Sequence, residues 1–217
     1  MEASVVGLRG SVLETARRMT EERLVVGSEG NVSARVRDME KMAITPSLVP
    51  YKEMKVEDIV VVNFQGEVVA GHRNPSAETK MHAAIYRARP EAGGVVHSHS
   101  VYASALAVLH ETIPPLIDEQ VALLGGEVKV AGYGVPGSEE LAKNAAQALE
   151  QRDATLLANH GVVCCGKSLS LALRNALLVE RLAQTYVIAR MTGQPRPLPE
   201  ESVELQRLVY ETTLGET

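Results

Sequence analysis

Two apolar runs that end in histidine constrain this chain more than any other feature. One is GGVVHSH at residues 93–99, and the other is ATLLANHG at residues 154–161. Short apolar runs bounded by turn residues are typical of buried strands. Because alternate side chains of a strand point to the same face, we expect His97 and His99 to lie side by side at the end of one strand.

The histidines of these two runs together form a ligand set typical of a catalytic metal site. His97, His99 and His160 would offer three nitrogen ligands and leave an open position on a zinc ion, as a catalytic site requires. Glu78 falls in the first turn of a predicted helix and could serve as the acid or base. Taken singly, each of these residues also has an ordinary structural interpretation. The other histidines are assigned to surface or packing roles: His72, His82 and His110.

The spacing of apolar residues predicts a mixed order of helices and strands, several of them antiparallel neighbours. Helices are predicted at residues 4–24, 79–87, 102–109, 138–151, 168–191 and 200–212, with one helical turn near 52–55 and an apolar element at 116–124. Strands are predicted at residues 32–36, 41–45, 59–62, 68–70, 93–99, 128–130, 154–158 and 162–165.

Composition limits the class of protein. The chain has 217 residues without a linker-like stretch, so residues 1–217 are expected to form a single domain. A net charge of -5 and only 3% aromatic residues argue against nucleic-acid binding. No signal peptide and no run of roughly 18 apolar residues is present, so no membrane partner is expected. The adjacent Cys164 and Cys165 are predicted to be reduced, small buried residues, which favours the cytoplasm.

A glycine-flanked turn, GSEGNVSAR at residues 27–35, is a candidate anion site. Backbone amides in such a turn, together with the side chains of Ser28 and Asn31, can surround an anion. An ordinary β-turn is the alternative interpretation of the same spacing.

Five motifs taken together resemble the class II aldolase/adducin family. They are GSEGNVSAR at 27–35, ITPS at 44–47, PSAE at 75–78, HSH at 97–99 and ANHG at 158–161, and they follow one another along nearly the whole chain. The resemblance implies an α/β fold of three layers, α/β/α, around a central, mostly antiparallel mixed sheet. It also implies a fourfold-symmetric homotetramer with active sites between subunits.

The resemblance assigns roles to individual residues. His97, His99 and His160 match the family's zinc ligands, with one ion per chain, and Glu78 matches its acid/base. The residues that match its phosphate-binding segments are Ser28, Gly30, Asn31, Thr45, Ser47 and Ser76. The implied reaction is cleavage of a small-molecule sugar phosphate, a ketose 1-phosphate, to dihydroxyacetone phosphate and an aldehyde through an enediolate.

The sequence also departs from the aldolases of that family. Glu29 stands where they have a small residue, Leu48 where they have glycine, and Ala77 where they have serine. Their catalytic tyrosine has no counterpart, because residues 118–120 are Asp-Glu-Gln, and Tyr210 is only near the position of a second, C-terminal tyrosine. We expect the Glu29 carboxylate to point out of the site.

These departures keep two other functions open. One is a related decarboxylase or epimerase on the same scaffold. The other is a non-catalytic, adducin-like assembly module, although members of that kind have lost the metal histidines that this chain keeps.

Overall fold

The computed structural model describes residues 2–215, with side chains from residue 7 to residue 212. Its centre is an eight-stranded sheet with the order β4-β3-β2-β1-β5-β8-β7-β6. In the described chain, neighbouring strands run antiparallel except β6 and β7, which are parallel. The strands are β1 (Asn31–Arg35), β2 (Lys41–Ile44), β3 (Val60–Asn63), β4 (Val68–Ala70), β5 (Gly94–Ser98), β6 (Val130–Ala131), β7 (Ala154–Leu157) and β8 (Gly161–Gly166).

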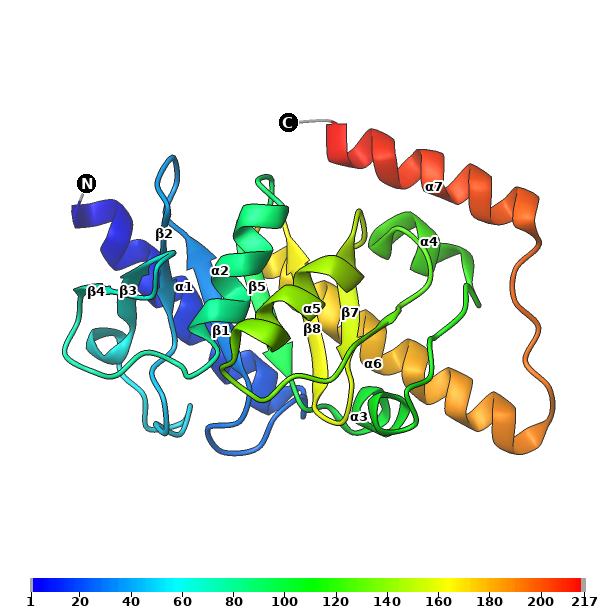
Figure 1. Cartoon of the computed structure of the whole chain (residues 1–217), viewed down its shortest axis with the longest axis horizontal. Helices are drawn as coiled ribbons and strands as arrows, with labels where there is room; N and C mark the ends of the chain where they lie inside the picture. The colour runs from blue at the N-terminus through cyan, green and yellow to red at the C-terminus, as the bar shows by residue number, and fades with distance from the viewer. Residues whose placement is uncertain (1, 216–217) are drawn as a thin grey trace.

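Helices cover both faces of this sheet (Figure 1). In that view α2 (Thr79–Ala88) and α5 (Glu139–Leu149) lie in front, and α1 (Glu2–Glu21) and α6 (Leu169–Thr192) lie behind. The other helices are η1 (Val56–Asp58), α3 (Val101–Val108), α4 (Asp118–Leu124) and α7 (Glu200–Gly215). The predicted three-layer fold with a mostly antiparallel sheet is therefore confirmed.

The alternation of side chains along the central strands explains the layers. Val96 and Cys164 point into the apolar cluster under α1 and α6, whereas Val95 and Cys165 point into the cluster under α2 and α5. Both thiols are free and fully buried, as predicted, and burial raises their pKa. His97 follows Val95 by two residues, so it lies on the α2 side of the sheet.

Element boundaries differ from the prediction mainly at the β6 edge. In place of the strand expected at residues 128–130, the structure has a two-residue strand at Val130–Ala131, and Val128 forms an isolated bridge with Ile113. Near residues 52–55 the chain makes one helical turn, in which the Met54 amide donates to the Pro50 carbonyl at 3.0 Å. Among the described residues, none of the helices combines the length and apolarity needed to cross a bilayer.

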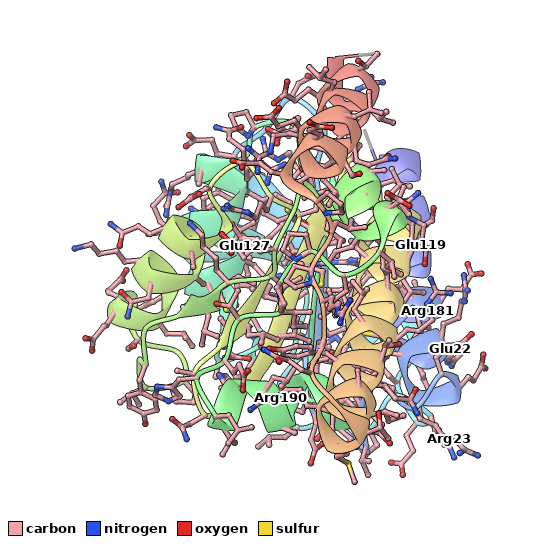
Figure 2. All side chains as sticks on the ribbon, turned by 90° about the vertical axis from the view of Figure 1, so that its right-hand side faces the viewer. Glu22, Arg23, Glu119, Glu127, Arg181 and Arg190 are labelled. Atoms are coloured by element: carbon pink, nitrogen blue, oxygen red, sulfur yellow. The ribbon has the colours of Figure 1, made fainter. Side chains whose placement is uncertain are left out.

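Tyr210 connects the C-terminal helix to the body of the protein. α7 packs against α4, and Tyr210 is only 5% exposed. Its hydroxyl donates to the Gln151 carbonyl at 2.8 Å and lies 3.0 Å from Asp153 Oδ1. Nearby, Glu119 of α4 forms an ion pair with Arg181 of α6 (Figure 2).

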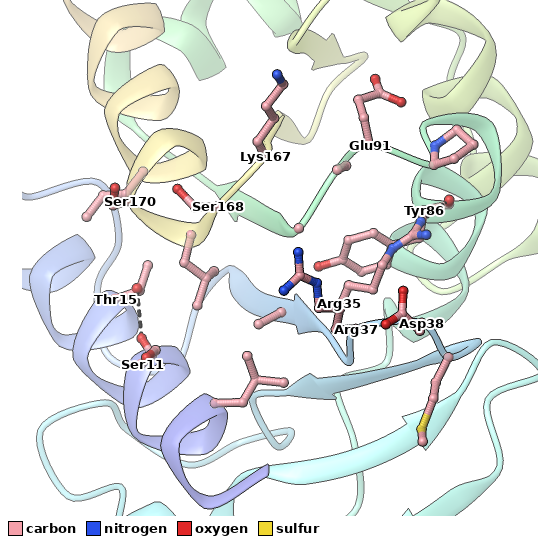
Figure 3. A pocket seen from close by; sticks show the side chains of 18 of the residues that line it. Ser11, Thr15, Arg35, Arg37, Asp38, Tyr86, Glu91, Lys167, Ser168 and Ser170 are labelled. Atoms are coloured by element: carbon pink, nitrogen blue, oxygen red, sulfur yellow. Dashed lines mark hydrogen bonds between the residues drawn. The ribbon is translucent and has the colours of Figure 1, made fainter. Parts of the chain in front are cut away.

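A large pocket lies at the end of the sheet away from the histidines. It has a volume of about 1170 Å³ and lies between α1, the start of α6 and the end of β1 (Figure 3). Arg35, Tyr86 and Ser168 are among its lining residues, but no histidine is. Arginine and lysine side chains there are matched by carboxylates such as Glu14 and Glu91, so the pocket has no clear preference for one charge.

Candidate active site

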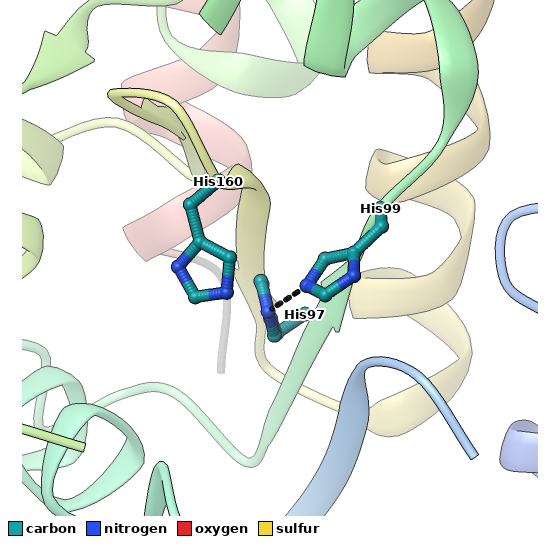
Figure 4. A group of neighbouring side chains, drawn as sticks. All are labelled: His97, His99 and His160. Atoms are coloured by element: carbon teal, nitrogen blue, oxygen red, sulfur yellow. Dashed lines mark hydrogen bonds between the residues drawn. The ribbon is translucent and has the colours of Figure 1, made fainter. Parts of the chain in front are cut away.

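The three predicted histidines converge at one point of the structure (Figure 4). His97 is in β5, His99 follows the end of that strand, and His160 is in the turn between β7 and β8. Their ligand nitrogens all lie within 4.8 Å of one another, and Nε2 of His97 is 3.0 Å from Nε2 of His99. His97 is fully buried, while His99 and His160 are partly exposed, so the group can be reached from solvent.

A hydrogen bond to the backbone determines which nitrogen of His97 is available to bind a metal. Its Nδ1–H donates to the Val162 carbonyl at 2.9 Å, which leaves Nε2 with the free lone pair in the neutral ring. A backbone carbonyl on the far nitrogen is the usual arrangement behind a metal-ligating histidine, because it fixes the tautomer and the ring orientation. The donor set, its convergence and this tautomer all fit a divalent metal ion.

Local backbone geometry explains the residues on either side of His160. Asn159 has φ 55°, in the left-handed region that asparagine tolerates better than most residues. A Cβ on Gly161 would lie 2.4 Å from the Ser98 carbonyl oxygen and 3.0 Å from the His99 ring. Only glycine fits there, so the Asn-His-Gly sequence brings two of the histidine-bearing segments into contact.

Glu180 of α6 fixes the segment that follows His99. Its two carboxylate oxygens accept the backbone amides of Tyr102 and Ala103 at 2.9 Å each, at the start of α3. A carboxylate at this end of a helix is favoured by the unpaired amides and the helix dipole. The sequence analysis missed Glu180, because nothing in the linear pattern pairs it with a residue almost 80 positions earlier.

Glu78 is the N-cap residue of α2, one position before the helix, and its carboxylate faces the histidines. Oε2 is 3.0 Å from His97 Nε2 and accepts the Asn31 side-chain amide at 2.9 Å. Oε1 has no hydrogen-bond partner among the described residues and lies 3.5 Å from His160 Nε2. Oε2 is therefore held by the hydrogen bond from Asn31, whereas Oε1 faces the histidines without a hydrogen bond from the described residues.

Charge couples these groups strongly. Burial alone would raise the pKa of Glu78, but positive charge on His97 and His160 holds it well below its usual range. Burial opposes the charged form of His97, yet the Glu78 carboxylate raises the pKa of this histidine. Burial and the neighbouring histidines lower the pKa of His99 to about 4 and also lower that of His160. The lowered pKa of Glu78 and the raised pKa of His97 both favour an ion pair in which these two side chains share one proton when no metal is bound.

The candidate phosphate segments lie next to this group. Gly30 has φ 67°, and a Cβ there would lie 2.4 Å from the His97 carbonyl oxygen, so its turn packs directly on the histidine strand. The segments around residues 45–47 and 74–76 are joined by a bridge between Pro46 and Pro75. Ser28, in the same turn as Gly30, is partly exposed.

The polar side chains of these segments already have partners within the protein. Thr45 is buried and its hydroxyl accepts the Val32 amide, while the Ser47 hydroxyl donates to the Pro75 carbonyl at 2.8 Å. The Ser76 hydroxyl accepts the Glu78 amide at 3.2 Å, and the Asn31 amide is held by Glu78. An anion at this position would have to share or replace these contacts.

The remaining residues that the sequence analysis named are Glu29, Asp118, Glu119 and Tyr210. Glu29 is exposed, and its charge acts weakly on the pKa of His99. Asp118 and Glu119 are exposed on α4, where Glu119 pairs with Arg181. Tyr210 of α7 forms hydrogen bonds with Gln151 and Asp153 in the body of the protein. Within the described chain, Asp118, Glu119 and Tyr210 therefore do not approach the histidines.

Leu48 occupies a strained turn, and replacing it by glycine is expected to stabilise the protein. It is 88% exposed and has φ 60°, in the left-handed region that costs a side-chain-bearing residue about 1–2 kcal/mol. The greater freedom of glycine in the unfolded chain offsets about 0.4–1 kcal/mol. We expect Leu48→Gly to raise the free energy of unfolding in urea. Leu48→Ala is the control, since it removes the same exposed side chain but keeps the Cβ; equal stability of both variants would contradict the strain.

A family profile described as "Class II Aldolase and Adducin N-terminal domain" matches residues 10–187. Among curated proteins, a 5-deoxy-D-ribulose 1-phosphate aldolase of Bacillus thuringiensis serovar kurstaki is 36% identical over 90% of this chain and 92% of that protein. An L-fuculose phosphate aldolase of Escherichia coli is 37% identical over 88% of this chain and 87% of that protein.

Solved structures give the same result. An L-fuculose 1-phosphate aldolase superposes with a TM-score of 0.90 and 38% identity, covering 94% of this chain and 96% of that one. YgbL from Klebsiella pneumoniae, whose description leaves aldolase, epimerase and decarboxylase open, superposes with a TM-score of 0.86 and 30% identity. That match covers 94% of this chain and 99% of the other.

Proposed function

Because this chain belongs to the class II aldolase and adducin family, we propose that it is a metal-dependent aldolase that cleaves a ketose 1-phosphate. The products would be dihydroxyacetone phosphate and an aldehyde. The observation that carries the proposal is the convergence of three imidazoles beside a carboxylate of which one oxygen, Glu78 Oε1, accepts no hydrogen bond from the described residues.

His97, His99 and His160 would hold the metal, for which we propose zinc, one ion per chain, since three imidazoles suit zinc and leave it an open position. Bound there, it would supply Lewis-acid polarisation of the substrate's carbonyl and hydroxyl oxygens. The His97 tautomer supports this role, because Nδ1–H is committed to Val162 and Nε2 is left to bind.

Glu78 would carry the proton to and from the carbon at which the carbon–carbon bond breaks. Its Oε2 is anchored by Asn31, and its Oε1 is free to exchange a proton with the substrate. A metal ligand must be unprotonated, so His97 would lose the charge that holds the pKa of Glu78 down. In the loaded site, burial would oppose the charged form of Glu78, while the positive charge of the bound ion would favour it.

A phosphorylated substrate is proposed from the likeness to these relatives. The named substrates of the relatives, deoxyribulose and fuculose phosphates, are ketose 1-phosphates. The turn at Ser28, Gly30 and Asn31, with Thr45, Ser47 and Ser76, is proposed to bind the phosphate beside the histidines.

We also propose a single domain, a cytoplasmic location and a homotetramer with active sites between subunits, the last because His99 and His160 open to the surface of the chain.

A decarboxylase or epimerase is the second candidate. Two observations favour it: the polar side chains of the phosphate segments are already engaged, and the exposed Glu29 adds negative charge near His99. The likeness to YgbL points the same way. A non-catalytic assembly module is disfavoured by the intact histidine group.

The test is a cleavage assay with and without metal. The zinc-loaded protein would be incubated with L-fuculose 1-phosphate, 5-deoxy-D-ribulose 1-phosphate, the matching unphosphorylated sugars and a β-keto acid. Release of dihydroxyacetone phosphate from a phosphorylated ketose, lost after chelation and restored by zinc, is the expected result. Turnover of the β-keto acid alone would replace the aldolase by a decarboxylase.

Metal binding is expected to release about one proton per ion at pH values below the raised pKa of His97 at which His99 and His160 are neutral. The pKa of His99 is lowered to about 4 and that of His160 is lowered as well, whereas the pKa of His97 is raised, so His97 is the ligand that keeps its proton to the highest pH. Below the raised pKa of His97, metal affinity should rise about tenfold per pH unit, and above it the affinity should level off. Calorimetry in buffers of different ionisation enthalpy measures the proton count. Release of about three protons would contradict the shared-proton arrangement.

A further inference from the structure

Two rows of polar side chains meet in the otherwise apolar layer between the sheet and α2. Asn31 and Ser33 alternate along β1 and therefore share its α2-facing side. Glu78, His82 and Tyr86 are spaced four residues apart, so they share one side of α2. Each row can be predicted from the sequence, because side chains on one face recur every second residue in a strand and every third or fourth residue in a helix. Only the structure shows that the two rows face each other.

These side chains form one hydrogen-bonded chain that ends at Glu78. His82 Nε2 lies 2.5 Å from Asn31 Oδ1, and His82 Nδ1 lies 2.6 Å from the Ser33 hydroxyl. That hydroxyl is 2.9 Å from the hydroxyl of Tyr86. The Asn31 amide nitrogen, in turn, donates to Glu78 Oε2 at 2.9 Å. His82 is fully buried, which agrees with the second of the surface or packing roles expected for it from the sequence.

The chemistry of Glu78 sets the direction of the hydrogen bonds from Glu78 through Asn31 and His82 to Ser33. A carboxylate only accepts, so Asn31 must turn its NH₂ toward Glu78 and its Oδ1 toward His82. His82 must then donate from Nε2–H, which makes its Nδ1 an acceptor for the Ser33 hydroxyl. Burial lowers the pKa of His82 to about 3, which keeps the ring neutral and able to do both.

We propose that His82 is a positioning residue for the acid/base Glu78: its Nε2–H locks the Asn31 amide with the NH₂ group on Oε2, so that Oε1 stays free toward the histidines. The inference rests on the proposed function. Without the donor on His82, the Asn31 amide can turn over and present its oxygen to the carboxylate. That orientation is repulsive and would displace Glu78.

A pair of variants separates positioning from simple packing. In His82→Gln, the longer amide can place an N–H where Nε2 stands, whereas in His82→Asn the amide reaches only the Nδ1 position and keeps the Ser33 contact. The readout is hydrogen–deuterium exchange into dihydroxyacetone phosphate in D₂O, catalysed by the zinc-loaded protein. This probe needs no choice of aldehyde.

We expect His82→Asn to lower kcat for exchange about tenfold with unchanged KM and zinc content, and His82→Gln to restore most of kcat. Tyr86→Phe is the control, because it removes a buried hydroxyl from the same chain without touching Asn31. It should leave kcat nearly unchanged. Equal losses in His82→Asn and His82→Gln, or a rise in KM with kcat kept, would overturn the proposal.

A structural readout keeps this test apart from the proposed function. Nitrogen-15 spectra of the wild-type protein should show His82 as the neutral Nε2–H tautomer from pH 5 to 8, and His82→Asn should speed hydrogen exchange of the Asn31 side-chain amide. An Nδ1–H tautomer would overturn the positioning role. Correct tautomer and amide protection without any exchange into dihydroxyacetone phosphate would instead count against the proposed reaction.

Discussion

Replacing Glu78 by Gln is expected to lower kcat by about 10²- to 10⁴-fold while the fold and the bound metal are retained. Gln has the same shape and can still accept the Asn31 amide, but it cannot carry a proton from Oε1. The measurement is steady-state cleavage of L-fuculose 1-phosphate and 5-deoxy-D-ribulose 1-phosphate, with zinc content determined on the same sample.

Glu140→Gln is the matched control for that change. Glu140 is an exposed carboxylate in the first turn of α5, so its replacement should leave kcat as it is. Wild-type kcat in Glu78→Gln would contradict the assignment of the acid/base role to Glu78.

Replacing His97 by Ala is expected to remove metal and activity together. Changes behind a ligand cost about 10- to 100-fold in metal affinity, so loss of a ligand itself should exceed 100-fold. His97 also lies close to two other members of the site, with its Nε2 3.0 Å from His99 Nε2 and 3.0 Å from Glu78 Oε2. Zinc would be counted per chain after dialysis, and the far-ultraviolet circular dichroism spectrum would report on the fold.

His72→Ala is the control for this variant, because its ring is largely exposed and lies by Asp58, away from the site. It should keep both zinc and activity. Full zinc occupancy in His97→Ala would contradict the ligand assignment even if activity were lost.

The histidine group could be predicted because local periods are enough to define it. Strand alternation puts His97 and His99 on one side, and an apolar run that ends in Asn-His-Gly marks a second strand end. What local patterns do not contain is strand order. β5 lies between β1 and β8, which come from far apart in the chain, and this pairing is what brings His160 to His97.

Other parts of the site depend on contacts between distant segments. The need for glycine at position 30 comes from the His97 carbonyl, and the hydroxyls of Thr45 and Ser47 are occupied by the neighbouring backbone. The sequence offers those hydroxyls as anion ligands but does not reveal their partners. The same holds for Tyr210, which the structure buries against Asp153 instead of near the histidines.

The most direct test of the account is exchange of hydrogen between dihydroxyacetone phosphate and D₂O, followed by mass spectrometry. If Glu78 moves a proton at the carbon next to the carbonyl, and the metal held by His97, His99 and His160 is required, the zinc-loaded protein should introduce a single deuterium. The exchange should stop on chelation, resume with zinc and be lost in Glu78→Gln. Exchange that persists without metal, or its absence from a fully zinc-loaded protein, would contradict the central claim.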